Sequence, residues 1–449
     1  MKTLTNFSYK KALVLGMAKS GEAAAQLLYD SGIDFRINDQ LPLEENETAR
    51  RFLENGLDVI TGGHPLSVLD DIEIVIKNPG IPYGHPIIKE AERRGLPVIT
   101  EVELSYALVD GPLIGITGSN GKTTTTRLIY ELLEAAGLKP LIAGNIGNVA
   151  SEVLRSQEKG QPVVMELSSF QLKGVRSFKP DIGILLNLTE AHLDYHETMD
   201  DYVQSKLKLF QNQTKNEVAI LNAIDQRTSK QEIPGNGKRV RFAIDGTDAD
   251  LNVDEEGYIK FGESRIIHKK EVALPGDHNL ENVLASIAVA KEFHISDEII
   301  SDVLTSFVGV KHRLQFVEIV NGRLFYNDSK ATNIVATSKA VRSFEQPVVL
   351  IAGGLDRGIE FDDLFTDLPN IKLCVAYGES KEKLKEAADR HGFDGMLLSE
   401  SLMEATQKAY QESSEGDIVL LSPACASWDQ FPSFEARGDM FIETVHKLK

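Results

Sequence analysis

Short apolar runs alternate with amphipathic stretches along the whole chain. Residues 12–15, 113–116 and 348–352 are such runs, and each is followed by a stretch of helical periodicity. This alternation is typical of parallel α/β architecture, in which helices cover the faces of a mostly parallel sheet. It falls into three blocks, and 449 residues are too many for one hydrophobic core. We therefore predict three α/β domains: a Rossmann-like domain over residues 1–104, a central P-loop-type domain over residues 105–309 and a C-terminal Rossmann-like domain over residues 310–449.

Charge and cysteine content exclude several classes of function. Acidic residues outnumber basic ones by 67 to 48, a formal charge of −19, so neither nucleic acid nor an anionic membrane is an expected partner. Cys374 and Cys425 are too few for a disulfide framework and lack metal-type spacing, so we expect them to be buried apolar side chains. No signal-peptide core opens the sequence, and no apolar run reaches membrane-spanning length. These features predict a cytoplasmic enzyme with reduced thiols and no membrane insertion.

A glycine-rich loop between an expected strand and an expected helix predicts a nucleotide-phosphate site. Its residues are Gly118, Ser119, Asn120, Gly121, Lys122, Thr123 and Thr124. Glycines allow successive backbone N–H groups to face one anion, and the helix N-terminus adds partial positive charge. Lys122 can reach the β- and γ-phosphates, and the Thr123 hydroxyl can bind Mg²⁺. Ile116 stands where a standard P-loop has its first glycine, so this loop is shortened; the alternative is a chance Gly-Lys-Thr tripeptide.

A second glycine turn follows the first expected strand. Gly16, Lys19, Ser20 and Gly21 lie in a segment similar to a dinucleotide-binding fingerprint, and Asp39 ends the next expected strand, where a ribose-binding acid would lie. The pattern predicts a bound nucleotide diphosphate. The alternative is a tight turn between strand and helix whose glycines serve only packing.

Polar side chains near the ends of other expected strands extend the phosphate site. Glu166 follows residues 163–165 and His192 lies just beyond residues 182–188, so both could face the loop and bind Mg²⁺. A salt bridge for Glu166 and a loop cap for His192 are the alternatives.

Lys206 and two asparagines are less distinctive candidates. Lys206 lies in the amphipathic stretch 202–210, where a solvated helix face is the alternative and where nothing distinguishes it from Lys208. Asn279 and Asn282 share one face near an expected helix start, so that their amides could read an adenine edge. N-capping by Asn279 explains half of that pattern equally well.

Taken together, six stretches of the sequence resemble the Mur ligase family, which builds the peptide of bacterial cell-wall precursors. The similarity spans essentially the whole chain and keeps the order of the motifs. The six stretches are residues 118–123, 166–172, 187–194, 311–313, 327–333 and 421–427. Within the family, residues 144–147, 168–172 and 427–434 resemble members that use D-glutamate as the acceptor.

The resemblance implies a role for each matched residue. Lys122 and Thr123 would hold the phosphates of ATP and one Mg²⁺ together with Glu166, and His192 would bind a second Mg²⁺ together with Lys206. Lys206 aligns with the carbamylated lysine of the family; CO₂ addition to its neutral amine would create the anionic ligand that an ammonium cannot be. Adenine, ribose and phosphate would be contacted by Asn279, Asn282, Arg313 and Asp328, and the uridine diphosphate by Gly16 to Gly21, Asp39 and Gly80. The muramoyl-alanine arm would lie near Asn145, Ser168, Gln171 and His192. D-Glutamate would be bound by Thr332, Arg357, Ser427 and Phe434. Some members carry Lys at the position of Arg357, and because Arg offers a planar fork and Lys a point charge, the mode of carboxylate binding stays open.

The resemblance also implies a reaction. ATP would convert the alanine carboxylate of UDP-N-acetylmuramoyl-L-alanine into an acyl phosphate, and the amine of D-glutamate would attack it to form an amide. The expected enzyme is a monomer whose domains close about a hinge near residues 306–312. The alternatives are another Mur-type or folylpolyglutamate-type ligase with a different acceptor, a nucleotide switch that forms no bond, and a nicotinamide oxidoreductase built on the first glycine turn.

Overall fold

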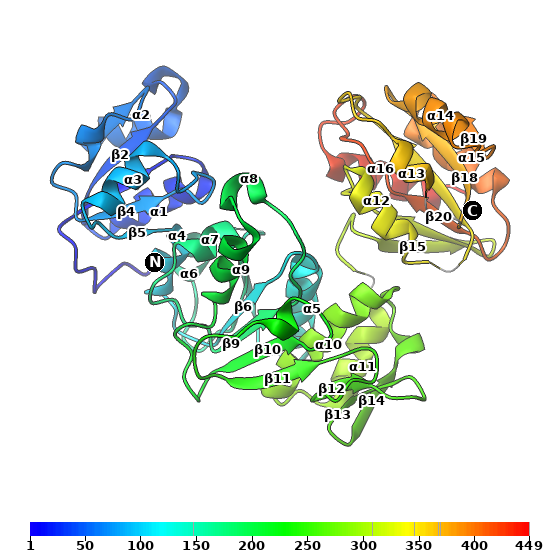
Figure 1. Ribbon diagram of the computed structural model, residues 1–449, viewed down its shortest axis with the longest axis horizontal. Helices are drawn as coiled ribbons and strands as arrows, with labels where there is room; N and C mark the ends of the chain where they lie inside the picture. The colour runs from blue at the N-terminus through cyan, green and yellow to red at the C-terminus, as the bar shows by residue number, and fades with distance from the viewer. Residues whose placement is uncertain (147, 308, 345, 367, 369, 449) are drawn as a thin grey trace. The chain divides into compact units, whose positions relative to one another are not determined.

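The computed structural model describes residues 1–146, 148–307, 309–344, 346–366, 368 and 370–448 (Figure 1). Gly147, in a stretch that indicated the D-glutamate acceptor, and Val308, in the predicted hinge, lie outside the described residues. The chain divides into two compact units, Met1–Glu271 with Glu281–Val303, and Val272–Leu280 with the chain from Leu304 onward. In the part of the chain that the structure describes, no helix has both the length and the apolar character needed to cross a membrane.

The first unit begins with a five-stranded parallel sheet in the order β3-β2-β1-β4-β5. Its elements are β1 (Lys11–Leu15), α1 (Lys19–Asp30), β2 (Asp34–Asp39), α2 (Glu47–Glu54), β3 (Asp58–Thr61), β4 (Ile74–Lys77), α3 (Pro86–Arg93), β5 (Val98–Ile99) and α4 (Glu101–Tyr106). Ala12 and Val14 of β1 pack into the core on the α1 and α2 side, whereas Leu13 and Leu15 pack with α3 on the other. Burial on both faces explains why β1 is a continuous apolar run.

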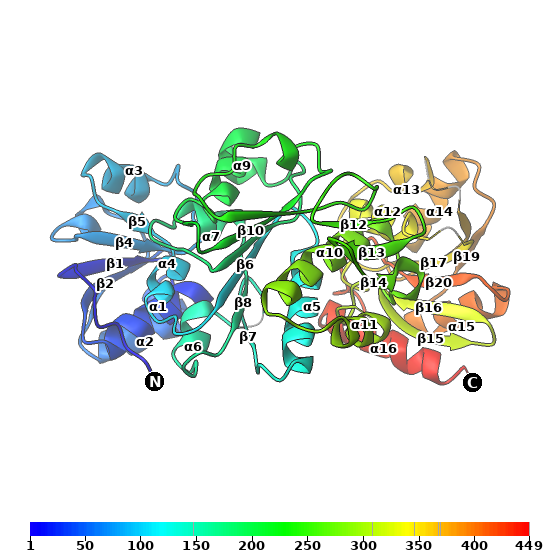
Figure 2. The ribbon, with the colours of Figure 1, turned by 90° about the horizontal axis from the view of Figure 1, so that it is seen from below.

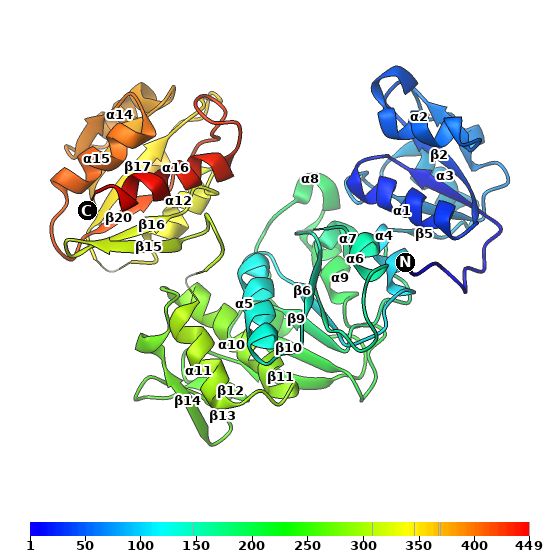
Figure 3. The same cartoon turned by 180° about the vertical axis from the view of Figure 1, so that it is seen from behind.

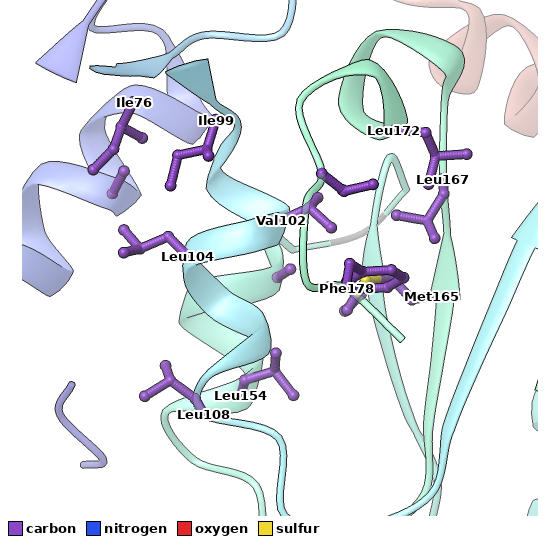
Figure 4. Packing of buried hydrophobic residues seen from close by; sticks show 14 of the residues in the cluster. Ile76, Ile99, Val102, Leu104, Leu108, Leu154, Met165, Leu167, Leu172 and Phe178 are labelled. Atoms are coloured by element: carbon purple, nitrogen blue, oxygen red, sulfur yellow. The ribbon is translucent and has the colours of Figure 1, made fainter. Parts of the chain in front are cut away.

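Helix α4 joins this sheet to the central one. Val102 and Leu104 belong to one continuous core with Ile76 and Ile99 of the first sheet and Met165 of the second. Figure 4 shows α4 lying between side chains from the two sides of this core. Because a single core serves both sheets, the first two sheets belong to one compact unit.

The central sheet has nine strands in the order β14-β13-β12-β11-β10-β9-β6-β8-β7. Its elements are β6 (Leu113–Thr117), α5 (Lys122–Ala135), β7 (Leu141–Gly144), α6 (Ala150–Leu154), β8 (Val163–Glu166), α7 (Ser169–Lys173), β9 (Ile182–Leu185), α8 (Leu193–His196), α9 (Met199–Leu207), β10 (Val218–Asn222), β11 (Lys238–Phe242), β12 (Leu251–Val253), β13 (Tyr258–Phe261), β14 (Ser264–His268), α10 (Asp277–Glu292) and α11 (Asp297–Ser306). Strand β13 pairs antiparallel with both β12 and β14, and the other neighbouring pairs are parallel. Helices α5 and α10 lie side by side against the sheet (Figure 3).

The second unit carries a six-stranded sheet in the order β15-β16-β20-β17-β18-β19. Its elements are β15 (Gln315–Val320), β16 (Arg323–Asn327), α12 (Ile334–Val341), β17 (Val348–Gly353), α13 (Asp362–Thr366), β18 (Ile371–Tyr377), α14 (Lys381–Arg390), β19 (Met396–Leu398), α15 (Leu402–Glu412), β20 (Ile418–Leu421) and α16 (Phe434–His446). Helices α12, α13 and α14 cover one face and α15 and α16 the other, as Figure 2 shows. Cys374 and Cys425 are buried and free, as predicted. Three sheets, each mostly parallel, confirm the predicted α/β class.

Candidate active site

The phosphate loop joins β6 to α5 where the strand order reverses, because β6 has β8 on one side and β9 on the other. In open parallel sheets, ligands bind in the crevice at such a point. Gly118 and Gly121 have φ angles of 153° and 83°, which side-chain-bearing residues rarely adopt. Helix α5 begins at Lys122, so the partial positive charge of its N-terminus lies at the loop. The geometry is that of an anion site.

Asn187, just after β9, holds one side of this loop. Its backbone oxygen accepts a hydrogen bond from Ser119 N (3.0 Å), and its Oδ1 accepts one from Asn120 N (2.9 Å). The prediction that successive loop N–H groups face an anion is therefore wrong for Ser119 and Asn120, because Asn187 supplies acceptors for both. Sequence reasoning gave Asn187 no role; the available signal was a polar residue closely following a buried strand.

Two lysines converge on one backbone oxygen of the loop. Lys122 Nζ donates to Gly118 O at 2.8 Å and to Ser119 O at 3.0 Å, and Lys206 Nζ donates to Gly118 O at 2.8 Å. Lys206 is only 1% exposed, with its amine 4.7 Å from the Tyr202 ring centroid. The solvated-face alternative is therefore wrong. Burial, followed by the nearby charge of Lys122, holds the pKa of Lys206 well below its ordinary value, although Glu166 opposes this shift.

Glu166, at the end of β8, connects the loop to a second segment. Its Oε2 accepts a hydrogen bond from Thr123 Oγ1 and its Oε1 accepts one from Asn145 Nδ2, both at 2.8 Å. Within the described residues no three His, Cys, Asp or Glu side chains are grouped to hold a metal. The Thr123 hydroxyl and the Glu166 carboxylate nevertheless supply the hard oxygen atoms that Mg²⁺ prefers. The donors present at this point thus fit such an ion.

An aromatic cluster lies beside His192, which is exposed and has a left-handed backbone (φ 57°). The Phe170 ring centroid lies 4.9 Å from that of His192 and 4.3 Å from that of Tyr195. The Tyr202 ring centroid lies 6.5 Å from that of His192 and 4.7 Å from the Lys206 amine. His192 occupies the N-cap position of α8, and its side chain forms no hydrogen bond that caps this helix. The structure brings His192 and Lys206 to one aromatic ring.

The first glycine turn is held by internal bonds. A Cβ on Gly21 would lie 1.8 Å from Gly16 O, so only glycine fits there. Asp39 accepts from Met17 N (2.6 Å) and Leu41 N (2.8 Å), and its carboxylate therefore shapes the turn. Lys19 is exposed at the start of α1.

Ser20 and Gly80 are brought together by an asparagine. Asn78 Nδ2 donates to Ser20 Oγ (2.9 Å), and Asn78 Oδ1 accepts from Gly80 N (3.1 Å). The two predicted uridine-diphosphate residues thus lie at one place, at the carboxyl ends of β1 and β4.

Lys77, the last residue of β4, was missed by sequence reasoning. Lys77 is 1% exposed, and its amine donates to the carbonyl oxygens of Asn78, Pro79 and Ile81, as well as to the Tyr195 hydroxyl (3.0 Å). Burial, then the charge of Lys173, lowers the pKa of Lys77 to about 7. The amine connects the loop that contains Gly80 with the helix that follows His192. The available signal was a lysine at the end of an apolar run.

Two further predicted pairs differ in their surroundings. Ser168 and Gln171 form a reciprocal capping box at the start of α7. Asn282 Oδ1 accepts a hydrogen bond from Thr125 Oγ1 (3.2 Å), which brings this asparagine to α5. Helix α10 begins at Asp277, so N-capping by Asn279 is wrong; its Nδ2 instead donates to Pro275 O (2.8 Å), within the second unit.

In the second unit, predicted residues follow three adjacent strands. Asp328 follows β16, Arg357 lies in the loop after β17 and Ser427 in the loop after β20, so all three lie at carboxyl ends of the sheet. Asp328 accepts from Ser422 Oγ (2.9 Å) and Leu314 N (3.1 Å), and burial raises the pKa of Asp328 to about 7 despite the opposing charge of Arg313.

Buried Arg437, which sequence reasoning also missed, ties α16 to these loops. It donates from Nε to Ser329 Oγ (3.0 Å) and from Nη2 to Cys425 O (3.0 Å). Ser329 Oγ in turn donates to the backbone oxygen of Phe434, the first residue of α16 (2.8 Å). Thr332 is half-buried, two residues before α12.

Comparison with known proteins agrees with this architecture. Three family models match the chain: a Mur ligase MurD-like N-terminal domain over residues 10–100, a Mur ligase middle domain over 116–290, and a Mur ligase glutamate ligase domain over 312–425. Enzymes named UDP-N-acetylmuramoylalanine--D-glutamate ligase from Bacillus cereus (strain AH820) and Bacillus thuringiensis (strain Al Hakam) are each 49% identical over 449 residues, 100% of both chains.

Solved structures share the fold at lower identity. UDP-N-acetylmuramate-alanine ligase MurC from Thermotoga maritima has a TM-score of 0.57 at 19% identity, covering 98% of this chain and 100% of that one. MurF ligase from Thermotoga maritima in complex with ADP has a TM-score of 0.56 at 17% identity, covering 93% and 96%. The 49% identity to the Bacillus enzymes over the full length of the chain, together with the three matching Mur ligase models, establishes that the chain belongs to the Mur ligase family.

Proposed function

We propose that this chain is an ATP-dependent amide ligase that adds D-glutamate to UDP-N-acetylmuramoyl-L-alanine during peptidoglycan precursor synthesis. The observation that carries the proposal is 49% identity over the full length to enzymes named for this reaction. The geometry supports it independently, because a phosphate loop at a topological switch point combines a helix N-terminus, Lys122 and a buried carboxylate, Glu166.

Each sheet is proposed to hold one substrate. Residues 1–104 would bind the uridine diphosphate at the turn of Gly16 and Gly21 and at Gly80. Residues 105–309 would bind ATP at the phosphate loop, and residues 310–449 would bind D-glutamate at the loops that contain Arg357 and Ser427. In each sheet these loops follow the carboxyl ends of parallel strands, where such folds bind their ligands.

The proposed chemistry has two steps. The alanine carboxylate attacks the γ-phosphorus of ATP, so that an acyl phosphate forms and ADP leaves. The neutral amine of D-glutamate then attacks the acyl carbon, and the tetrahedral intermediate collapses to the amide with loss of phosphate and of the amine proton. Lys122 and the N-terminus of α5, which begins at this lysine, would screen the charge of the transferred phosphoryl group.

Metal ligands are proposed from the same residues. Thr123 and Glu166 would hold one Mg²⁺, and His192 and carbamylated Lys206 a second. When bound, these ions would neutralise phosphate charge. Burial supports the carbamate, because a lowered pKa leaves more of the Lys206 amine neutral and able to add CO₂ at neutral pH. A monomer in the cytoplasm is part of this proposal, and light scattering tests its oligomeric state.

Mass spectrometry of the product tests the proposal. The protein is given UDP-N-acetylmuramoyl-L-alanine, ATP and a mixture of D-glutamate, L-lysine, diaminopimelate and L-alanine. We expect one product with the mass of added glutamate, formed only with the D-enantiomer when the two are tested separately. Addition of another amino acid would make the chain a Mur-type ligase of different acceptor. ATP hydrolysis that is slow and independent of the UDP-linked substrate would instead indicate a nucleotide switch.

A further inference from the structure

Two loops of the second unit are fastened together at the carboxyl ends of neighbouring strands. Gly353 N donates to Pro423 O (2.8 Å), and Leu355 N donates to Ala426 O (3.0 Å). A Cβ on Gly354 would lie 2.3 Å from Ala426 O, so the two backbones are in direct contact. The loop after β17 therefore cannot shift without the loop after β20.

This arrangement places a cation over an exposed aromatic ring. The guanidinium carbon of Arg357 lies 4.8 Å from the ring centroid of Trp428, within the range of a cation–π interaction. Trp428 is 64% exposed and is the sole tryptophan of the chain. The turn that carries it is fixed, because Ser427 O accepts hydrogen bonds from Gln430 N (3.2 Å) and Phe431 N (2.8 Å).

The acidic residues near Arg357 in the sequence form ion pairs with other cations. Asp356 pairs with Lys383 (2.7 Å), and Glu360 pairs with Arg390 (3.2 Å). Among the described residues, no carboxylate lies within ion-pair distance of the Arg357 guanidinium. A cation–π contact forms no hydrogen bond to a carboxylate, so the N–H donors of Arg357 remain for a carboxylate of the acceptor, which a guanidinium can bind through two parallel hydrogen bonds.

We propose that Trp428 is a positioning residue, whose ring holds the guanidinium of Arg357 ready for a carboxylate of the incoming amino acid. The ring restricts the conformations of Arg357 before binding, so less rotamer freedom is lost when the acceptor arrives. The identity of the acceptor, D-glutamate, rests on the proposed function. The cation–π contact between Trp428 and Arg357 does not depend on the proposed function.

Fluorescence tests the contact between Arg357 and Trp428 without any substrate. A full positive charge close to an indole perturbs its emission, and all tryptophan emission of this chain comes from Trp428. We expect Arg357→Met to change the intensity or the wavelength of that emission. Lys383→Met is the matched control, because it removes a neighbouring cation that pairs with Asp356. Unchanged emission in Arg357→Met, or the same change in Lys383→Met, would overturn the proposal whatever reaction the chain catalyses.

Kinetics test the consequence for the acceptor. Trp428→Leu is expected to raise the KM for D-glutamate roughly 2- to 5-fold, the range of an exposed cation–π contact, with kcat and the KM for the UDP-linked substrate unchanged. Trp428→Phe keeps a ring face and should recover most of the loss. In an Arg357→Met background, Trp428→Leu should add nothing.

The outcomes separate the two proposals. Equal effects of Trp428→Leu with and without Arg357 would mean that the ring acts on its own, and would overturn the positioning role. If the wild-type chain does not ligate D-glutamate at all, the proposed function fails. The emission measurement still decides in that case whether Arg357 contacts Trp428.

Discussion

Gly121→Ala tests how the phosphate loop is held against α10. Gly121 immediately precedes α5 with φ 83°, and a Cβ there would lie 2.1 Å from Asn282 Oδ1. That oxygen also accepts a hydrogen bond from Thr125 Oγ1. The substitution therefore strains the backbone and displaces the Asn282 amide. Gly137 is a matched control, because it follows the other end of the same helix with φ 77° and has no atom within 4 Å of a Cβ.

The two variants should differ by the contact alone. A left-handed backbone costs an L-residue roughly 1–2 kcal/mol, and both variants bear this cost. Only Gly121→Ala also disturbs the hydrogen bond between Thr125 and Asn282, a contribution of about 1 kcal/mol. We expect a loss in the free energy of unfolding of about 2–3 kcal/mol for Gly121→Ala and about 1–2 kcal/mol for Gly137→Ala.

Denaturant unfolding and ATP kinetics measure both effects. Because Asn282 is proposed to contact adenine, Gly121→Ala should also raise the KM for ATP, whereas Gly137→Ala should leave it unchanged. In an Asn282→Ala background the clash is gone, and adding Gly121→Ala should cost no more than Gly137→Ala does. Equal stability losses and equal KM values for ATP in the two single variants would refute the reasoning.

Three further predictions concern charge. Lys122→Ala should reduce kcat at least ~100-fold in the ligation assay, as expected for the loss of one electrostatic group; a milder effect would remove Lys122 from the phosphate site. Lys206→Ala should reduce kcat similarly, and CO₂-free buffer should slow the wild-type enzyme until bicarbonate is restored; retained activity in the variant would exclude the carbamate. Burial raises the pKa of Glu101 to about 7, so its contribution to stability is complete below about pH 4.5 and is lost as the pH rises through 7. Glu101→Gln should therefore remove roughly 3 kcal/mol of the decline in unfolding free energy between pH 4.5 and 8 in denaturation experiments, and an unaltered pH profile would contradict a buried acid.

The sequence predicts the three sheets well because parallel strands are apolar on both faces. Runs such as residues 113–116 and 348–352 have no polar face to lose, and their periodicity differs clearly from that of the helices between them. The phosphate loop is also predictable, because its glycines, the strand before it and the helix after it are neighbours in the sequence.

Roles that depend on strand order are not predictable in this way. Asn187 binds the phosphate loop because β9 lies beside β6, although some 70 residues separate the two partners. The sequence pattern does not distinguish Lys206 from Lys208, whereas the packing of α9 buries Lys206 almost completely and Lys208 only in part. The N-cap alternative for Asn279 is wrong for a smaller reason, because α10 begins at Asp277.

The shared acceptor at Gly118 O brings two amines together and predicts proton uptake when a nucleotide binds. Two amines that donate to the same oxygen repel one another when both are charged, and the charge of Lys122 lowers the pKa of Lys206 in addition to the larger effect of burial. Bound phosphates would favour the charged form of Lys206, so any neutral fraction of that amine would take up a proton as ATP binds. A carbamate on Lys206 has no amine left to protonate. Calorimetry in two buffers of different ionisation enthalpy thus counts protons and reports the chemical state of Lys206 before any catalysis occurs.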